Sequence, residues 1–292
     1  MVINKHGSFY MRDGWITKII EAVDEDKCIF TPSNEQAAID NIGLGRIMVK
    51  ALRYWAVALG LTTESKTSKG IEQEPTKLFE LIRKYDKYAQ KTGTLLMLHR
   101  HLVNNLDEAT AWYWFFNEKK DAVITREEFV EGFHSYLSVN GMKVNKAAVE
   151  KEFNCLRSTY ITDKQVSLKT IMDEDTISYF SVAKLLQNTP EGYKKTAVSL
   201  SDLSVELLIY AIADDNPGQR ETKGQLSVEK LLEEKGQVGR YFNIQYTELI
   251  DGLLLAENKG YIKLNNNFGN RFIEFVDIDY QNLLEKYYAE RK

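Results

Sequence analysis

The sequence contains few cysteines and no long apolar run, and each shortage excludes a class of protein. Cys28 and Cys155 are the two cysteines among 292 residues, too few for a disulfide framework, and neither has a partner at metal-ligand spacing. No apolar segment approaches the length that spans a bilayer, and residues 1–9 lack the hydrophobic stretch of a signal peptide. We therefore expect a cytoplasmic protein without membrane contact.

An excess of positive charge is also missing. Lysine and arginine total 38 against 42 aspartates and glutamates, so the net charge is −4. This balance excludes a protein that coats nucleic acid with its whole surface, and any such contact must be a local basic patch. The four prolines and the 43% hydrophobic content indicate a mostly helical globular chain, long enough for two or three modules.

Signatures of catalysis are absent from the sequence as well. It has no Gly-x-Ser-x-Gly elbow, no phosphate-binding Gly-Lys-Ser/Thr loop and no Gly-x-Gly-x-x-Gly fingerprint. His99 and His101 lie two residues apart in a predicted helix, where they point to different faces and favour packing over metal binding. The acidic residues 173–175 are more typical of a solvated loop than of a nuclease metal site. We expect no catalytic residue, no cofactor and no metal.

The most informative pattern that is present is a pair of helices joined at Gly43. An apolar stripe precedes this glycine and a second one follows it, and a short turn between helices needs the positive φ that glycine adopts at least cost. This layout predicts a helix-turn-helix within residues 37–55. The apolar positions are Ala38, Ile39 and Ile42 before the turn, and Leu44, Val49, Leu52 and Trp55 after it.

The second of these helices has a basic side. Arg46, Lys50, Arg53 and Tyr54 lie away from its apolar stripe, and no acid occurs between Arg46 and Gly60. A cationic helix with one buried face fits the major groove or the phosphate backbone, so we predict that these four residues bind DNA. An ordinary helical hairpin with a solvated basic face would explain the same pattern.

The segment before the helix pair adds a further DNA-binding candidate, Arg12. Together with His6 and Trp15 it mixes an acid–base group, a cation and a stacking surface. Trp15 is better explained as a core anchor. A patch that joins Arg12 to Arg46 and Arg53 would extend a track for phosphates across one face.

The chain after residue 61 divides into a middle and a C-terminal zone. Residues 62–70 are polar and predict a loop or a domain boundary. The middle zone, 62–199, is predicted to be a helical scaffold, in which the five successive aromatics of 112–116 must be largely buried. Thr125 and Glu128 have the spacing of a capping box. The predicted domains are 1–61, 62–199 and 200–292.

The C-terminal zone predicts a winged helix. A helix capped by Ser201-Asp202, a second over 227–235 and a third over 246–258 precede two alternating runs, 261–264 and 271–275, around an asparagine-rich turn. The third helix carries acids, Glu248, Asp251 and Glu257, which disfavour phosphates, so docking to protein is the favoured role. In the wing, Lys263 and Arg271 are the candidate DNA contacts.

Several separated blocks resemble a bacterial family known as domain of unknown function 4007. The chain differs at two places, having Arg46-Ile47 where the family commonly has Lys-Asn, and Gly7-Ser8 where it has Glu-Thr. Family members tend to lie beside genes of DNA phosphorothioation and phage-defence systems, so the resemblance implies an accessory DNA-associated role and no catalytic assignment. The blocks are residues 6–9, Arg12, 14–15, 44–55, 93–99 and 109–117.

Two functional classes therefore remain. The first is a non-enzymatic DNA-binding subunit of a DNA-modification or phage-defence system, with duplex DNA and proteins of that system as partners. The second is a protein-interaction scaffold of such a complex that makes no direct DNA contact. The sequence leaves a homodimer open in either case.

Overall fold

A computed structural model describes residues 1–162, 177–267 and 269–290 of the chain. The chain divides into two compact units: residues 1–115 with 119–195, and residues 116–118 with 196–292. Residues 1–61 and most of the region 62–199 thus belong to the same unit. The expected mostly helical fold is confirmed, and small antiparallel sheets accompany the helices. The acidic residues 173–175 lie outside the described residues.

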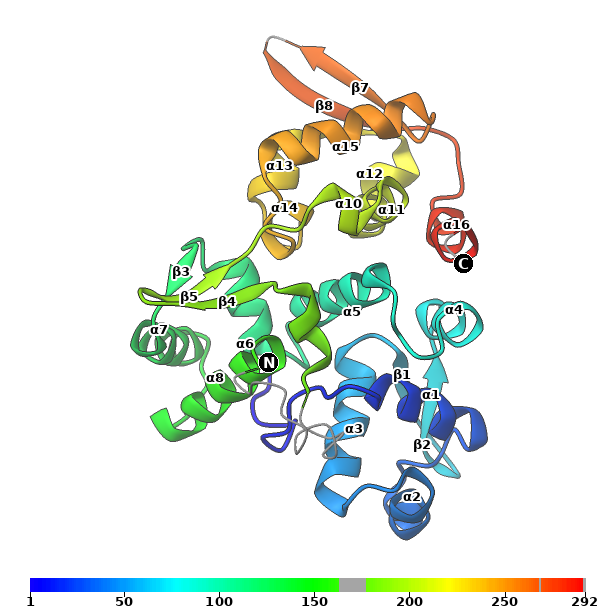
Figure 1. Ribbon diagram of the computed structural model, residues 1–292, viewed down its shortest axis with the longest axis vertical. Helices are drawn as coiled ribbons and strands as arrows, with labels where there is room; N and C mark the ends of the chain where they lie inside the picture. The colour runs from blue at the N-terminus through cyan, green and yellow to red at the C-terminus, as the bar shows by residue number, and fades with distance from the viewer. Residues whose placement is uncertain (163–176, 268, 291–292) are drawn as a thin grey trace, which may run out of the picture. The chain divides into compact units, whose positions relative to one another are not determined.

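The first unit begins with three helices that pack on one another: α1 (Trp15–Glu25), α2 (Glu35–Ile42) and α3 (Arg46–Ala58). A short 3-10 helix, η1 (Pro32–Asn34), leads into α2. Gly43 ends α2 with a φ of 70°, as the turn between the two predicted helices requires. Figure 1 shows α2 and α3 as the consecutive pair that this turn joins.

Residues 62–70 form part of a β-hairpin, so the prediction of a loop there was wrong. Strand β1 (Thr62–Thr67) pairs antiparallel with β2 (Gly70–Pro75), in a register that opposes Thr62 to Pro75. The strand was hidden because β1 has one buried residue and no apolar alternation. A buried hydrogen bond of 2.6 Å from the Thr62 hydroxyl to Gln73 Oε1 links the two strands.

The rest of the first unit is a set of helices with a three-stranded antiparallel sheet in the order β3-β5-β4. Helices α7 and α8 pack as a pair (Figure 1). The elements are α4 (Lys77–Tyr85), α5 (Thr92–Asn104), α6 (Thr110–Tyr113), the π-helical turn η2 (Trp114–Glu118), of which residues 116–118 belong to the second unit, β3 (Val123–Ile124), α7 (Arg126–Val139), α8 (Lys146–Tyr160), η4 (Tyr179–Ala183), β4 (Leu186–Thr189) and β5 (Gly192–Lys195).

The aromatic run is buried, as predicted. Trp112, Trp114, Phe115 and Phe116 are all within the core. The Trp112 ring lies edge-on to Trp55, with centroids 5.5 Å apart, and Trp114 packs edge-on against Phe129 at 5.1 Å. Edge-to-face pairs of this kind add to the stabilisation that burial of their apolar area provides.

Two further expectations for this unit are confirmed. His99 and His101 lie in α5, and the buried His99 bonds through Nδ1 to the Tyr160 hydroxyl at 2.8 Å, as a packing histidine does. Thr125 and Glu128 form the predicted capping box at the start of α7.

The second unit combines helices with a three-stranded sheet in the order β6-β8-β7. Figure 1 shows the β7–β8 hairpin lying over α15 and projecting away from the helices of this unit. The elements are α10 (Leu200–Leu203), α11 (Val205–Asp215), α12 (Pro217–Thr222), β6 (Gln225–Ser227), α13 (Val228–Glu233), α14 (Val238–Tyr241), α15 (Tyr246–Asn258), β7 (Ile262–Asn267), β8 (Asn270–Phe275) and α16 (Gln281–Glu290).

The structure confirms the hairpin and the 246–258 helix but corrects the start of this unit. The single helix expected after Ser201 is two helices, because Ser204 has a φ of 63° and interrupts it. Ser199 caps the first helix and Ser204 the second. Strand β6 was missed because three residues are too few to show an alternation. Phe268, inside the predicted turn, lies outside the described residues.

Candidate nucleic-acid interface

Helix α3 presents its basic side to solvent near its N-terminal end. The side chains of Arg46 and Lys50 are each 66% exposed, while Val49 and Leu52 are buried. Both cations contact one carboxylate on α2: Glu35 lies 2.7 Å from Arg46 Nε and 3.2 Å from Lys50 Nζ. The predicted basic side therefore exists, and a neighbouring helix places one acid beside it.

Arg53, one turn further along, is held by Glu64 of β1. Arg53 donates from Nε and Nη2 to the two carboxylate oxygens, both at 2.6 Å. These bonds raise the pKa of Arg53. Burial pushes the pKa of Glu64 upward, but hydrogen bonds from Arg53 and Gln73 outweigh burial, so this pKa is below its usual value. The guanidinium is thus fixed in orientation.

The local charge on α3 is smaller than the sequence predicts. Arg46, Lys50 and Arg53, with the carboxylates Glu35 and Glu64, carry a formal charge of +1. Glu35 and Glu64 could not be predicted as neighbours of these cations, because they lie in α2 and β1 and not in α3 itself. The pairs that Glu35 forms with the exposed Arg46 and Lys50 stabilise little, so a phosphate can compete for these two cations.

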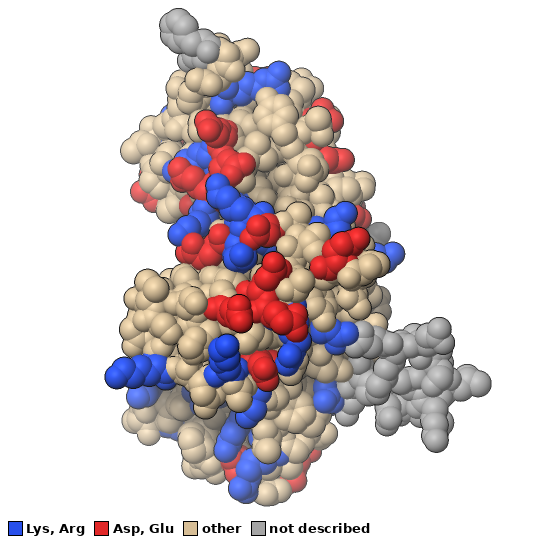
Figure 2. Space-filling model, turned by 90° about the vertical axis from the view of Figure 1, so that its left-hand side faces the viewer, with Lys and Arg blue, Asp and Glu red and all other residues tan. Residues whose placement is uncertain are grey.

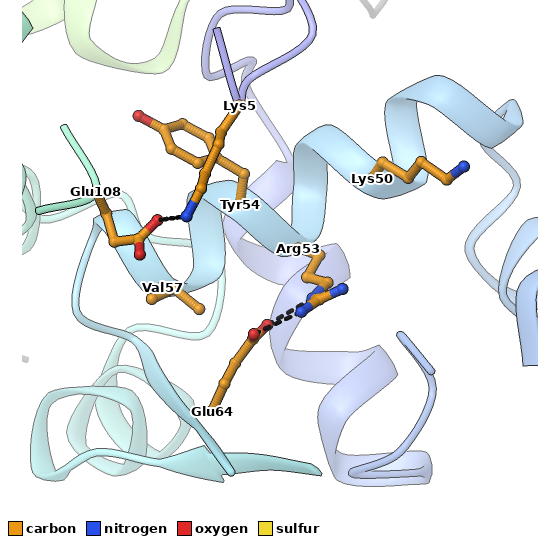
Figure 3. Close-up of a pocket in the computed structure, with 7 residues that line it drawn as sticks. All are labelled: Lys5, Lys50, Arg53, Tyr54, Val57, Glu64 and Glu108. Carbon is orange, nitrogen blue, oxygen red and sulfur yellow. Dashed lines mark hydrogen bonds and ion pairs between the residues drawn. The ribbon is translucent and has the colours of Figure 1, made fainter. Parts of the chain in front are cut away.

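A pocket of about 310 Å³ opens beside this helix. Its wall on α3 consists of residues at helical spacing, so that cations and apolar surface share one face. Figure 3 shows Arg53 facing Glu64 and, separately, Lys5 facing Glu108. The lining residues are Lys5, Lys50, Arg53, Tyr54, Val57, Glu64 and Glu108. Lys50 and Arg53 also line a smaller pocket of about 170 Å³ with Glu35 and Val49.

The prediction that Tyr54 lies on the outer side of α3 with the cations was wrong. Its side chain is 7% exposed and packs edge-on against His6, with centroids 5.9 Å apart, and against Trp55 at 5.2 Å. Burial raises the pKa of the Tyr54 hydroxyl well above its usual value. The N-terminal segment, distant in sequence, covers the ring and leaves it as part of the pocket wall.

Arg12 lies apart from the pockets beside α3. Its guanidinium sits over the rings of Phe9, Tyr10 and Trp15, 5.4 to 5.7 Å from their centroids. Trp15 is fully buried, as expected of a core anchor. Arg12 lines neither of the two pockets that Arg53 lines, so the structure does not bring it into one site with Arg53.

His6 is buried and bonds to a buried carboxylate. Its Nε2 lies 3.2 Å from Glu152 Oε1, and its Nδ1 accepts a hydrogen bond of 3.0 Å from the Ser8 backbone N–H. The Asn4 backbone N–H donates to the same carboxylate oxygen. These bonds tie the N-terminal segment to α8.

The part of the chain that the structure describes contains no group of three or more His, Cys, Asp and Glu side chains able to hold a metal ion.

In the second unit, the candidate cations of the hairpin are exposed. Lys263 is 66% exposed and lies 4.0 Å from Glu274, its neighbour across the strands, and Arg271 is exposed near the end of the hairpin. No helix among the described residues is long and apolar enough to cross a membrane.

Two of the three acids of α15 have structural roles. Glu248 accepts a hydrogen bond of 2.9 Å from the Leu200 backbone N–H, and Glu257 accepts one of 2.7 Å from the Leu264 N–H. The helix also exposes three large apolar side chains, Tyr246, Leu254 and Leu255. Its outer side therefore carries exposed apolar side chains as well as the exposed Asp251.

Charge over the wider surface is mixed. On the face drawn in Figure 2, lysine and arginine side chains are interspersed with aspartates and glutamates. A mixed surface concentrates no long-range field. A polyanion would therefore be held by local contacts such as those on α3.

Comparison with known proteins defines the family. A family model described as a protein of unknown function, DUF4007, matches residues 3–288. The chain belongs to this family. Its fold is similar to that of two crystal structures of a protein named SspB, one of them bound to magnesium ion. The TM-scores are 0.82 and 0.81, at 23% and 21% identity, covering 98% of this chain and 88% of each SspB chain. The search of curated proteins found no match.

Proposed function

We propose that this DUF4007 protein is a DNA-binding accessory subunit of a DNA-modification or phage-defence system and acts by binding, without catalysis. In this proposal α2 and α3 form a helix-turn-helix, and the second unit is a winged helix with β7–β8 as its wing. Duplex DNA and proteins of the same system are the partners, and the cytoplasm is the compartment. The family resemblance supports a role in such a system, and the exposed cations of α3 support DNA binding.

The observation that carries the proposal is the exposure of Arg46 and Lys50 one turn apart on α3, directly after the Gly43 turn. In a helix-turn-helix the first residues of the second helix face the DNA. Ile47, 60% exposed between these cations, offers an apolar contact of the kind that a thymine methyl accepts. Arg53 adds a third cation to the same side of α3.

A second candidate role, protein docking, has its own support in the second unit. Tyr246, Leu254 and Leu255 expose apolar surface on α15, where a winged helix that reads DNA would carry cations. Lys263 and Arg271 remain the residues through which the wing could instead reach DNA. The two roles are compatible, since α3 would hold DNA and α15 a protein.

Binding to a fluorescent duplex, followed by anisotropy over a salt series, tests the proposal. We expect binding at low salt. For each phosphate contact, the logarithm of the affinity should fall by about 0.9 for every tenfold rise in salt concentration. Photo-crosslinking of the same complex should place adducts on residues 46–53. Absence of duplex binding by the intact chain at low salt would refute DNA binding and leave the scaffold role.

A supercoiled plasmid incubated with the protein tests the claim that no catalysis occurs. Because one SspB structure contains magnesium ion, the incubation is run with and without Mg²⁺. We expect the plasmid to remain supercoiled in both. Nicking that requires Mg²⁺ and follows the purified protein through a sizing column would show that the chain is an enzyme.

A further inference from the structure

The pocket between α3, β1 and the N-terminal segment has features that a phosphate-binding surface does not need. A single phosphate needs donors and charge, whereas this pocket of about 310 Å³ also has an apolar wall of Val57 and the Tyr54 ring. Its volume lies at the lower end of the range for small-molecule sites, about 300 to 1,000 Å³. The ligand that fits is one charged group attached to a flat or apolar body.

The Nη1–Nη2 edge of Arg53 indicates which charged group the ligand carries. Glu64 occupies Nε and one hydrogen of Nη2, and Nη1 makes no hydrogen bond within the described residues. The Nη1–Nη2 edge can therefore bind a second oxyanion in the bidentate manner that phosphate favours. Gln73, fully buried, donates to Glu64 at 2.7 Å and keeps the whole arrangement in place.

The charge of the pocket limits how many phosphates it takes. Lys5 pairs with Glu108 and Arg53 with Glu64, while Lys50 contacts Glu35 outside this lining, so the lining residues carry a formal charge of +1. That charge matches one phosphodiester of a nucleic-acid strand. A nucleoside triphosphate would bring several negative charges against two fixed carboxylates, so like-charge repulsion disfavours it.

We propose that this pocket receives one unpaired nucleotide of a DNA strand, with the phosphate that links it to the duplex on Arg53 and its base or sugar against Val57 and Tyr54. A base stacked within a duplex cannot enter a pocket in the protein surface, so the site selects single-stranded ends, gaps or flaps next to the duplex held by α3. This inference rests on the DNA binding proposed above and specifies the structure of the DNA.

The test compares two labelled DNAs: a blunt duplex of about 20 base pairs, roughly two helical turns, and the same duplex with a short unpaired overhang. We expect the overhang to strengthen binding by about tenfold, within what contact of one base with an aromatic wall supplies. Val57→Trp should fill the pocket and abolish this preference while blunt-duplex affinity stays unchanged. The matched control is Val139→Trp, the same change at an exposed valine on α7.

A second variant keeps the inference testable if Val57→Trp fails to fold. Lys5→Gln changes an exposed side chain and lowers the formal charge of the pocket from +1 to zero, so the preference for the overhang should shrink. Lys143→Gln, at an exposed lysine outside the pocket, should leave it intact. Circular dichroism verifies the fold of each variant.

The outcomes separate the two proposals. Equal affinity of the wild type for blunt and overhanging DNA, with duplex binding intact, would overturn the nucleotide pocket and leave the DNA-binding proposal in place. A preference that persists in both Val57→Trp and Lys5→Gln would also overturn it. Failure to bind either DNA at low salt would remove both proposals together.

Discussion

Neutralising Lys50 and Arg53 together should weaken duplex binding by an amount that follows from their number of phosphate contacts. We choose Lys50→Gln with Arg53→Gln because the amide can still donate to the carboxylates that these cations contact, Glu35 and Glu64. Glutamate at position 53 would instead oppose Glu64, which now lies 2.6 Å from the guanidinium, and would confound binding with stability.

The expected size is worked from counterion release. Each phosphate contact contributes about 0.9 to the slope of log affinity against log salt, so the loss of two contacts should flatten the slope by about 1.8. If wild type and variant bind equally at ~1 M salt, the same relation predicts that the variant loses about 60-fold in affinity at ~0.1 M salt and about 20-fold at ~0.2 M. The effect should therefore shrink as salt rises.

Fluorescence anisotropy over this salt range measures both the affinity and the slope. The matched control is Lys143→Gln with Lys146→Gln, which changes the net charge equally at two exposed lysines outside the pockets beside α3. We expect the control to keep the wild-type slope. An unchanged slope in the Lys50/Arg53 variant, or an equal loss in the control, would show that α3 does not contact the phosphates.

Trp112→Ala should lower the free energy of unfolding by about 3–5 kcal/mol, as truncation of a buried aromatic does, and urea titration would show a smaller loss if the ring were dispensable. Glu64→Gln tests the lowered pKa of Glu64: its charged form stabilises the fold above the unfolded pKa, near 4.5, and this contribution is lost as pH falls through the lower folded pKa. The unfolding free energies of wild type and Glu64→Gln should therefore converge as pH falls from about 5 to about 3, and a constant gap would contradict that assignment. Lys263→Gln with Arg271→Gln should leave duplex affinity nearly unchanged if α15 and the wing serve protein docking. A drop as large as that of the α3 variant, with DNA crosslinks on residues 261–272, would mean that the wing is the DNA contact.

Local patterns in the sequence were sufficient for many of the elements. The Gly43 turn, the helix over 246–258, the capping box at Thr125 and the hairpin after Tyr261 were all predicted, because capping, periodicity and turn chemistry act over a few residues. Burial of the aromatic run followed from its length alone, since no single face holds five successive rings. The β1–β2 hairpin and the break at Ser204 were missed because polar strands and single positive-φ residues leave no periodic signal.

The sequence by itself determined that one side of α3 is cationic, because that depends on spacing within one helix. The tertiary structure decided what surrounds those cations. Glu35 and Glu64 reach them from α2 and β1, His6 covers Tyr54, and Lys5 and Glu108 complete the pocket. These partners are distant in sequence or lie in other elements, so only folding brings them together. Charge, exposure and shape at the candidate site are therefore properties of contacts between segments, which no pattern within one segment encodes.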